Sequence, residues 1–263
     1  MTDFLMFTVC APLASWGEIA VGEMRGSWDR PSRSAILGLL AAGLGLSREE
    51  RDAHDELDRS LSIAVRADAP GDLIADYHTT QSVAASIVKR RGLGTRAELM
   101  AVRPEDRETI LSRRTYRANA VSTIAVWQRA TATRSLSVLQ RALERPGFVP
   151  YAGRKANALA LPMAPSIESQ ETMAAAFAAR ESSMAVRFVE QFRPTGGWGS
   201  EIAHDPCEQF ASGLSGPLRR EVRRDTHPDR SRWQFAERIV EIGFLPRGRG
   251  TGSANGTEET NHA

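Results

Sequence analysis

The segment from residue 33 to residue 45 restricts the possible folds more than any other part of the chain. Its large apolar side chains cover most of the circumference of a helix: Ile36, Leu37, Leu39, Leu40 and Leu44. Such a helix must be buried on more than one side. Ser32 or Ser34 can cap its start after Pro31, and Gly45 can end it. Gly38 and Gly43 would let it pack closely against a sheet.

The segments around this helix predict the rest of a sheet. Short apolar or alternating runs indicate strands at residues 4–10, 61–67, 73–80 and 120–127, and charged or periodic segments indicate helices at 48–59 and 135–144. Along the chain, the predicted order is strand, helix, surface helix, three strands and a final helix. This order favours an α+β, ferredoxin-like sheet with helices on one face.

The domain boundaries follow from changes in pattern. Residues 1–165 are predicted as the ferredoxin-like domain, from which residues of about 78–117, a polar stretch with few periodic apolar positions, make an excursion. Residues 166–246 form a smaller C-terminal α/β part, with a helix at 169–180 and strands at 184–190 and 238–244. Residues 247–263 are expected to be a disordered tail.

Composition is that of an ordinary globular chain of 263 residues, 41% hydrophobic and 25% charged. No apolar run is long enough to span a bilayer, and the first residues lack the basic region of a signal peptide. Cys10 and Cys207 form neither a disulfide framework nor a metal-binding motif. We therefore expect a cytoplasmic protein with no membrane contact, no metal and no cofactor.

Positive charge is concentrated in the excursion although the whole chain carries only +2. Residues 77–117 hold nine cations and four acids, a net +5: Lys89, Arg90, Arg91, Arg96, Arg103, Arg107, Arg113, Arg114 and Arg117 against Glu98, Glu105, Asp106 and Glu108. A basic arm on a body that is net negative is suited to following a phosphate backbone. The alternative is an ordinary solvated loop.

A second basic cluster is weaker evidence for nucleic-acid binding. It consists of Arg219, Arg220, Arg223, Arg224, Arg230 and Arg232, diluted by three acids. With residues three and four apart, it is equally consistent with a surface face of ion pairs on a helix.

Catalytic motifs are poorly represented in the sequence. No serine-hydrolase, zinc-protease or Walker motif is present, and the histidines lack metal-ligand spacing. Tyr77 and His78, with the distant Lys155, are the one candidate set, because metal-free RNA cleavage needs a general base and a general acid. A structural role for this histidine is the simpler interpretation.

Several short motifs, in order, resemble one protein family, the CasD subunit of type I-E CRISPR Cascade complexes in the RAMP superfamily. The matching segments are Ala-Pro-Leu-Ala-Ser-Trp-Gly at 11–17, the helix segment at 30–45, Asp-Tyr-His-Thr at 76–79, Thr-Tyr-Arg-Ala-Asn-Ala at 115–120, Pro-Tyr-Ala-Gly-Arg-Lys at 150–155 and Gln-Phe-Ala-Glu-Arg at 234–238. The sequence departs from the family pattern at Ala35, at residues 117–119 and at Ala156-Asn157.

The resemblance implies an RRM-related domain with a protruding thumb and a small C-terminal β part. It implies a non-catalytic subunit that caps the 5′ handle of the guide RNA and contacts the large PAM-recognising subunit and the terminal backbone subunit. Target DNA would be contacted only indirectly, through the complex. A related subtype that cleaves RNA with Tyr, His and Lys groups keeps Tyr77, His78 and Lys155 as the endoribonuclease alternative, and a structural bridge without RNA contact is a third.

The resulting hypothesis assigns RNA contacts to three groups of residues: the loop and helix start, the arm, and the later glycine-arginine segment. They are Ser15, Trp16, Arg25, Arg30, Arg33, Ser34, His78, Lys89, Arg90, Arg91, Arg96, Arg113, Arg114, Arg117, Gly153, Arg154 and Lys155.

Overall fold

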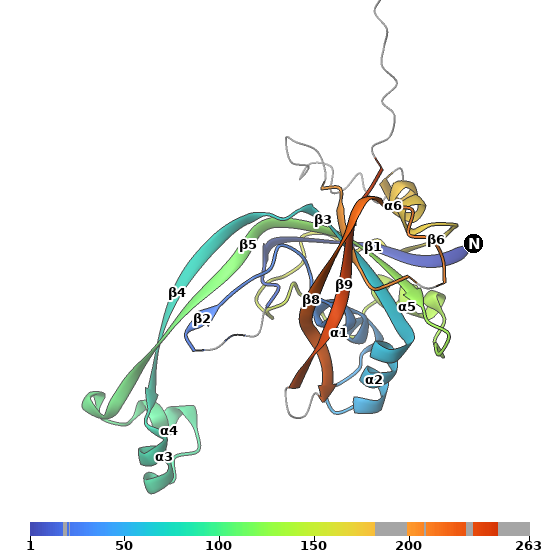
Figure 1. Cartoon of the computed structure of the whole chain (residues 1–263). Coiled ribbons are helices and arrows are strands. Elements are labelled where there is room, and N and C mark those ends of the chain that lie inside the picture. The colour runs from blue at the N-terminus through green and yellow to red at the C-terminus, as the bar shows by residue number, and fades with distance from the viewer. Residues whose placement is uncertain (18–19, 21, 182–198, 208, 230–233, 247–263) are drawn as a thin grey trace, which may run out of the picture.

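The computed structural model describes residues 1–17, 20, 22–181, 199–207, 209–229 and 234–246. Its main element is one sheet, mostly antiparallel, with the strand order β6-β1-β5-β3-β7-β9-β8 and with β2 and β4 paired to β5 off this path (Figure 1). The strands are β1 (Thr2–Ala14), β2 (Met24–Arg25), β3 (Leu61–Ala69), β4 (Asp72–Val83), β5 (Arg107–Gln128), β6 (Ser166–Gln170), β7 (Glu201–His204), β8 (Ser215–Asp229) and β9 (Gln234–Phe244). The α+β class with an antiparallel sheet is thus confirmed.

The predicted apolar helix is α1 (Arg33–Leu44), and the structure confirms both of its signals. Ser32 is the N-cap and accepts a hydrogen bond from the Ala35 amide, while Gly45 ends the helix in the left-handed conformation at φ 72°. The close approach predicted from glycine is also present, since a Cβ on Gly43 would lie 2.9 Å from the Ala142 carbonyl oxygen. Gly43 therefore packs against α5 (Leu136–Glu144) rather than against the sheet.

Both faces of the sheet are covered by a hydrophobic core. Along the central strands, successive side chains point alternately into one core and the other. Leu5, Phe7 and Val9 of β1 enter the core shared with α1 and α5. Phe4 and Met6 enter the core beneath α6 (Met173–Glu181). The helix α2 (Arg51–Ser60) packs beside α1, and none of the described helices is both long and apolar enough to cross a membrane.

Three sequence expectations about strands and helices need correction. The first strand does not stop at Ala11-Pro12 but runs to Ala14, where proline is tolerated because β1 pairs with β6 only from Thr2 to Met6. Residues 73–80 directly follow the strand at 61–67 and were expected to pair with it as a returning strand. They belong to β4, which pairs with β5 and not with β3. The C-terminal helix begins at Met173, because residues 166–170 form β6.

Two further expectations concern the C-terminal region. Arg219, Arg220, Arg223 and Arg224 of the second arginine cluster lie on the strand β8 instead of a helix, and Arg230 and Arg232 lie outside the described residues. Residues 238–244 are confirmed as part of β9. The strand expected at 184–190 and the tail at 247–263 lie outside the described residues.

Strands β4 and β5 leave the body together and form a long, curved two-stranded ribbon, which we call the arm (Figure 1). Their register is continuous from Asp72 opposite Ala118 to Val83 opposite Arg107. Two short helices and a 3-10 turn form the tip: α3 (Ala85–Arg91), α4 (Arg96–Met100) and η1 (Pro104–Asp106). The excursion predicted at residues of about 78–117 is therefore an ordered ribbon with a helical tip rather than an irregular loop.

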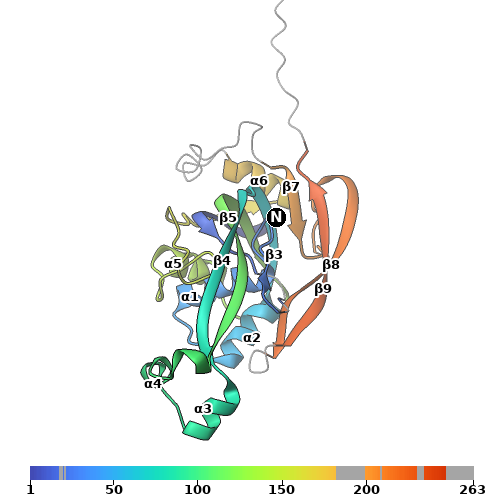
Figure 2. The same ribbon diagram turned by 90° about the vertical axis from the view of Figure 1, so that its left-hand side faces the viewer.

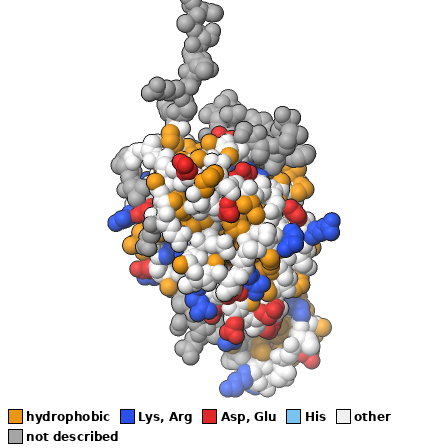
Figure 3. All heavy atoms as spheres, turned by 90° about the vertical axis from the view of Figure 1, so that its right-hand side faces the viewer, with side chains coloured by type: hydrophobic (Ala, Val, Ile, Leu, Met, Phe, Trp, Pro, Cys, Tyr) orange, Lys and Arg blue, Asp and Glu red, His pale blue; other side chains and the backbone are white. Residues whose placement is uncertain are grey.

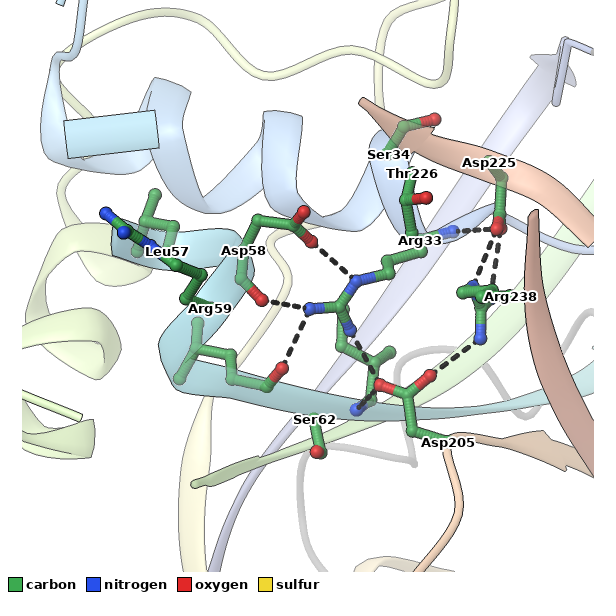
Figure 4. A network of polar contacts seen from close by, with 12 residues as sticks. Arg33, Ser34, Leu57, Asp58, Arg59, Ser62, Asp205, Asp225, Thr226 and Arg238 are labelled. Atoms are coloured by element: carbon green, nitrogen blue, oxygen red, sulfur yellow. Dashed lines mark hydrogen bonds and ion pairs between the residues drawn. The ribbon is translucent and has the colours of Figure 1, made fainter. Parts of the chain in front are cut away.

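A buried network of charges joins the hairpin β8–β9 to the rest of the body (Figure 4). Asp205 lies at its centre: one oxygen accepts from Arg33 at 2.6 Å and from the Ile63 amide at 3.0 Å, and the other accepts from Arg238 at 2.6 Å. Asp225 accepts from the Arg33 amide at 2.8 Å and also pairs with Arg238. Burial opposes ionisation of Asp225, but the hydrogen bonds and charge of Arg238 outweigh it and hold the pKa of this carboxyl below its usual value.

We predict that Asp205→Ala lowers the free energy of unfolding by about 3–5 kcal/mol, because it leaves Arg33 and Arg238 as buried charges without their shared partner. Glu237→Ala is the matched control, since it breaks a pair with Arg224 in which both side chains are more than half exposed. That change should cost less than about 1 kcal/mol. Urea unfolding of the three proteins measures both values, and equal losses for the two variants would show that the network is not what holds the hairpin.

Candidate nucleic-acid interface

The cations of the arm divide into engaged and free groups. Near the tip, Arg91 lies 3.1 Å from Asp106, and Arg107 donates to the carbonyls of Val102 and Met100. Arg103 lies 3.6 Å from Glu105. Over the described residues, four cations of the arm have neither an ion pair nor a hydrogen bond from the charged group: Lys89, Arg90, Arg113 and Arg114. These four retain their full capacity to bind an external anion.

Arg113 and Arg114 lie on the half of the ribbon nearer the body; we call this half, residues 113–118 of β5, the arm root. Here β2 adds a third strand beside β5, with Met24 opposite Arg113 and Arg25 opposite Arg114. Because side chains alternate along a strand, Arg113 and Arg114 project from opposite faces of the ribbon. The root therefore presents one free guanidinium on each face.

A glycine-arginine loop closes against the arm root. The Ser15 amide donates to the Ala152 carbonyl at 3.1 Å, and a Cβ on Gly153, which has φ 83°, would collide with the Ser15 carbonyl oxygen. Only glycine permits this contact. It brings the Arg154 guanidinium over the ring of Tyr116, 4.5 Å from the ring centroid, on the ribbon face that carries Arg114.

The structure thus brings three distant segments together at the arm root. Arg25, Arg113, Arg114 and Arg154 come from a loop strand, the arm and the glycine-arginine loop. Tyr116 is the residue of this group that the sequence analysis did not assign to the site. Tyr116 lies in the family-like motif at residues 115–120. Its position two residues from Arg114, and so on the same face of a strand, was the sequence signal that could have identified it.

Four other residues predicted to contact RNA are buried and engaged inside the protein. Trp16 is 1% exposed within the main core, and Ser15 is 3% exposed. The guanidinium of Arg33 donates to Asp58, Asp205 and the Leu61 carbonyl, and its side chain is 2% exposed. Arg30 is 9% exposed and pairs with Asp29 and Glu201. In this structure these residues position the loop and the start of α1. Among the described residues, Arg30 Nη1 and Trp16 Nε1 still lack a hydrogen-bond partner.

Three further predicted residues keep moderate exposure but have internal contacts. Arg117 donates to the Trp28 carbonyl at 3.1 Å and so ties the arm to the loop before α1. Ser34 is half-buried beside Ser32, and Arg96 lies 3.4 Å from the Gln81 carbonyl. Of these three residues, Arg96 is exposed, whereas Ser34 and Arg117 are half-buried.

Tyr77, His78 and Lys155 are not assembled into one constellation. Tyr77 is 63% exposed, and His78 Nε2 lies 2.6 Å from an Asp76 carboxylate oxygen. Tyr77 and His78 are adjacent in β4 and so project to opposite faces. The loop of Lys155 meets the ribbon at Tyr116, opposite Ile74, four residues or about 13 Å from His78 along the strand.

The two cysteines are poorly suited to nucleophilic chemistry. Burial raises the pKa of the Cys10 thiol to about 11, and burial with the nearby charges of Glu241 and Asp205 raises that of Cys207 to about 12. Both are therefore protonated at neutral pH. Within the described ranges, no group of three His, Cys, Asp or Glu residues could hold a metal ion.

The arginines of β8 differ from those of the arm in being neutralised. Arg219 and Arg223 pair with Glu221, Arg220 with Glu241, and Arg224 with Glu237. The sequence left open whether this cluster binds or forms ion pairs, and the structure supports ion pairs. On the side of the molecule shown in Figure 3, acidic and basic side chains are likewise interspersed, with apolar groups gathered near the centre.

Comparison with known proteins agrees with the motifs. The family model described as CRISPR-associated protein (Cas_Cas5) matches residues 4–241. The CRISPR system Cascade subunit CasD of Escherichia coli K12 is 32% identical over 163 residues, which are 62% of this chain and 70% of that protein.

Two solved structures share the fold. One is a chain of a CRISPR RNA-guided surveillance complex, with a TM-score of 0.53 and 24% identity over 92% of this chain and 89% of that one. The other is described as a crystal structure of a Cas protein, with a TM-score of 0.51 and 23% identity over 92% and 95% of the two chains. The family assignment made from the motifs is confirmed, and the chain belongs to the Cas5 (CasD) family of CRISPR-associated proteins.

Proposed function

We propose that this chain is a non-catalytic subunit of a type I-E Cascade complex that binds the guide RNA at its 5′ handle. Its partners would be the large PAM-recognising subunit and the terminal backbone subunit, in the cytoplasm, with target DNA reached only through the complex. The observation that carries the proposal is the arm, whose root presents Arg113 and Arg114 without acidic partners among the described residues.

The strand order supports a ferredoxin-like, RRM-related RAMP core. Strands β1, β3, β5 and β6, with α1 and α5 in the crossovers, follow the succession strand-helix-strand-strand-helix-strand and lie in the order β6-β1-β5-β3. The arm interrupts this succession between β3 and the body half of β5. We accordingly interpret the arm as the thumb and the region after β6, from residue 171, as an addition to the core, which moves the boundary expected at residue 166 by five residues.

Electrostatics at the arm root favour a single strand of RNA as the ligand. Free guanidiniums stand on both faces of the ribbon, and Tyr116 with Arg154 provides a stacked surface beside one of them. Single-stranded RNA is bound through phosphate contacts and through unstacked bases that lie on aromatic rings or guanidinium planes. The arm root offers both kinds of contact within a few residues.

We predict that Arg113→Ala/Arg114→Ala weakens binding of repeat-derived RNA and lowers the slope of log K against log salt by about 0.7 for each phosphate that the variant no longer neutralises. The matched control is Arg48→Ala/Arg51→Ala, which removes two exposed arginines near α2. Fluorescence anisotropy between about 50 and 300 mM salt measures the slopes. Equal slopes for both double variants would exclude the arm root as the phosphate-binding site.

A metal-free repeat endoribonuclease is the second candidate, and the Asp76–His78 pair is the observation that favours it. A carboxylate beside a half-exposed histidine can orient the ring as a general base. Against it, Tyr77 projects to the other ribbon face, and the loop that carries Lys155 meets the ribbon at Tyr116 through Arg154, about 13 Å from His78 along the strand.

We therefore predict no handle-specific cleavage when the full chain is incubated with repeat RNA in EDTA. Denaturing gel electrophoresis of the RNA detects any product. Cleavage that disappears in His78→Ala but persists in His54→Ala would establish the endoribonuclease and reject the non-catalytic assignment.

A further inference from the structure

A pocket of about 220 Å³ lies between the inner face of the β8–β9 hairpin and the loop that precedes α1. Figure 2 shows this hairpin on the side of the body away from α5. The pocket is apart from the surface formed by Tyr116 and Arg154. Its walls include Trp28, Val65, Ala203 and Val240, together with Arg30, Arg223 and Arg238.

Its size and lining indicate a small flat ligand group. The pocket is below the 300–1,000 Å³ of sites for drug-sized molecules. Most of the exposed lining is apolar, and one wall is built from stacked planes, since the Arg223 guanidinium lies 3.6 Å from the centroid of the Trp28 ring. Glu221 holds Arg223 in place with two hydrogen bonds, of 2.8 and 3.1 Å.

Arg30 lines this pocket and keeps one unsatisfied donor. Its Nε and Nη2 bind Asp29 and Glu201, but its Nη1 is buried and has no hydrogen-bond partner among the residues described. A buried donor without an acceptor is costly, and an aliphatic side chain in the pocket would leave it unsatisfied. A ligand with a ring nitrogen or carbonyl acceptor would satisfy it.

A hydrogen bond also links the wall of the pocket to the arm root. The Trp28 carbonyl accepts from Arg117, and Arg113 lies four residues farther along β5, on the same face of the ribbon. A strand bound at Arg113 therefore passes about 13 Å from the residue that holds the pocket wall. The other free root cation, Arg114, projects from the opposite face.

We propose that this pocket receives one unstacked nucleobase of the bound single-stranded RNA, with its ring against the Arg223–Trp28 stack and an acceptor atom toward Arg30. The proposal rests on the proposed RNA-binding function and adds a residue-level site to it. RNA bases that are splayed from a single strand bind in this manner on aromatic and guanidinium planes. The charged side chains around the pocket are paired with acids, so the site would select for a base rather than for a phosphate.

The test combines abasic RNA with a variant that fills the pocket. Ala203 is half-buried on β7, on the same strand face as Glu201, and lines the pocket, so Ala203→Phe should occupy it. Ala175→Phe, at a half-buried alanine of α6 outside the pocket, is the matched control. Binding of the full chains is measured with repeat-derived RNAs in which each nucleotide in turn is abasic.

We expect one abasic position to raise the Kd of the wild type and of Ala175→Phe about tenfold, within the range for loss of one stacked base. Ala203→Phe should bind intact RNA about tenfold more weakly and show no further loss at that position. A flat abasic profile in a wild type that binds RNA would reject the pocket and leave the RNA-binding function standing. No RNA binding by the wild type at low salt would reject both.

Photocrosslinking of the wild type gives a result that does not depend on any variant folding. RNAs with single 4-thiouridine substitutions should yield, from one position, a crosslinked peptide containing Trp28 or residues 222–225. Crosslinks confined to residues 107–117 would overturn the proposal. So would unchanged RNA affinity in Ala203→Phe together with loss of a protein partner, since the pocket would then hold a protein side chain.

Discussion

The buried carboxylate of Asp205 is the constraint on which the rest of this structure depends. It joins Arg33 at the start of α1 to Arg238 on β9, and it also accepts from the Ile63 amide and so fixes the backbone of β3. Charges this deeply buried are tolerated only when every one is paired. The network therefore fixes the hairpin β8–β9 in one position over the loop before α1, and the pocket between them follows from that position.

The same constraint explains why the conspicuous arginines of the sequence are not the accessible ones. Arg30 and Arg33 stand in a family-like motif and were predicted to contact RNA, yet both pair with acids that lie about 170 residues later in the chain. An ion pair between residues so far apart in the sequence leaves no pattern among neighbouring residues from which it could be predicted. Arg113 and Arg114 remain free because the arm carries them away from the body, where no acidic side chain of the described residues reaches them.

How far the sequence could predict this molecule depends on whether the signal was local. The cap at Ser32, the helix end at Gly45 and the strand at residues 120–127 were predictable, because each rests on neighbouring residues or on a continuous apolar run. The pairing of β4 was not, since residues 73–80 alternate equally well beside β3 or in a separate ribbon. The decisive fact is the 22-residue length of β5, whose first half is polar and lacks the buried apolar residues that would indicate a strand.

Asn119 marks the point where these two halves of β5 meet. It has φ 57°, a conformation that asparagine tolerates better than most residues, and it falls between the half-buried ribbon and the wholly buried body strand. Opposite it, Gly71 approaches the Ala118 carbonyl so closely that a Cβ would collide with the oxygen. The departure from the family motif at residues 117–119 thus coincides with a backbone bend at the base of the arm. The direction of the arm, and with it the placement of Arg113 relative to the Trp28 pocket, is set by this bend and by the Arg117 contact to the Trp28 carbonyl.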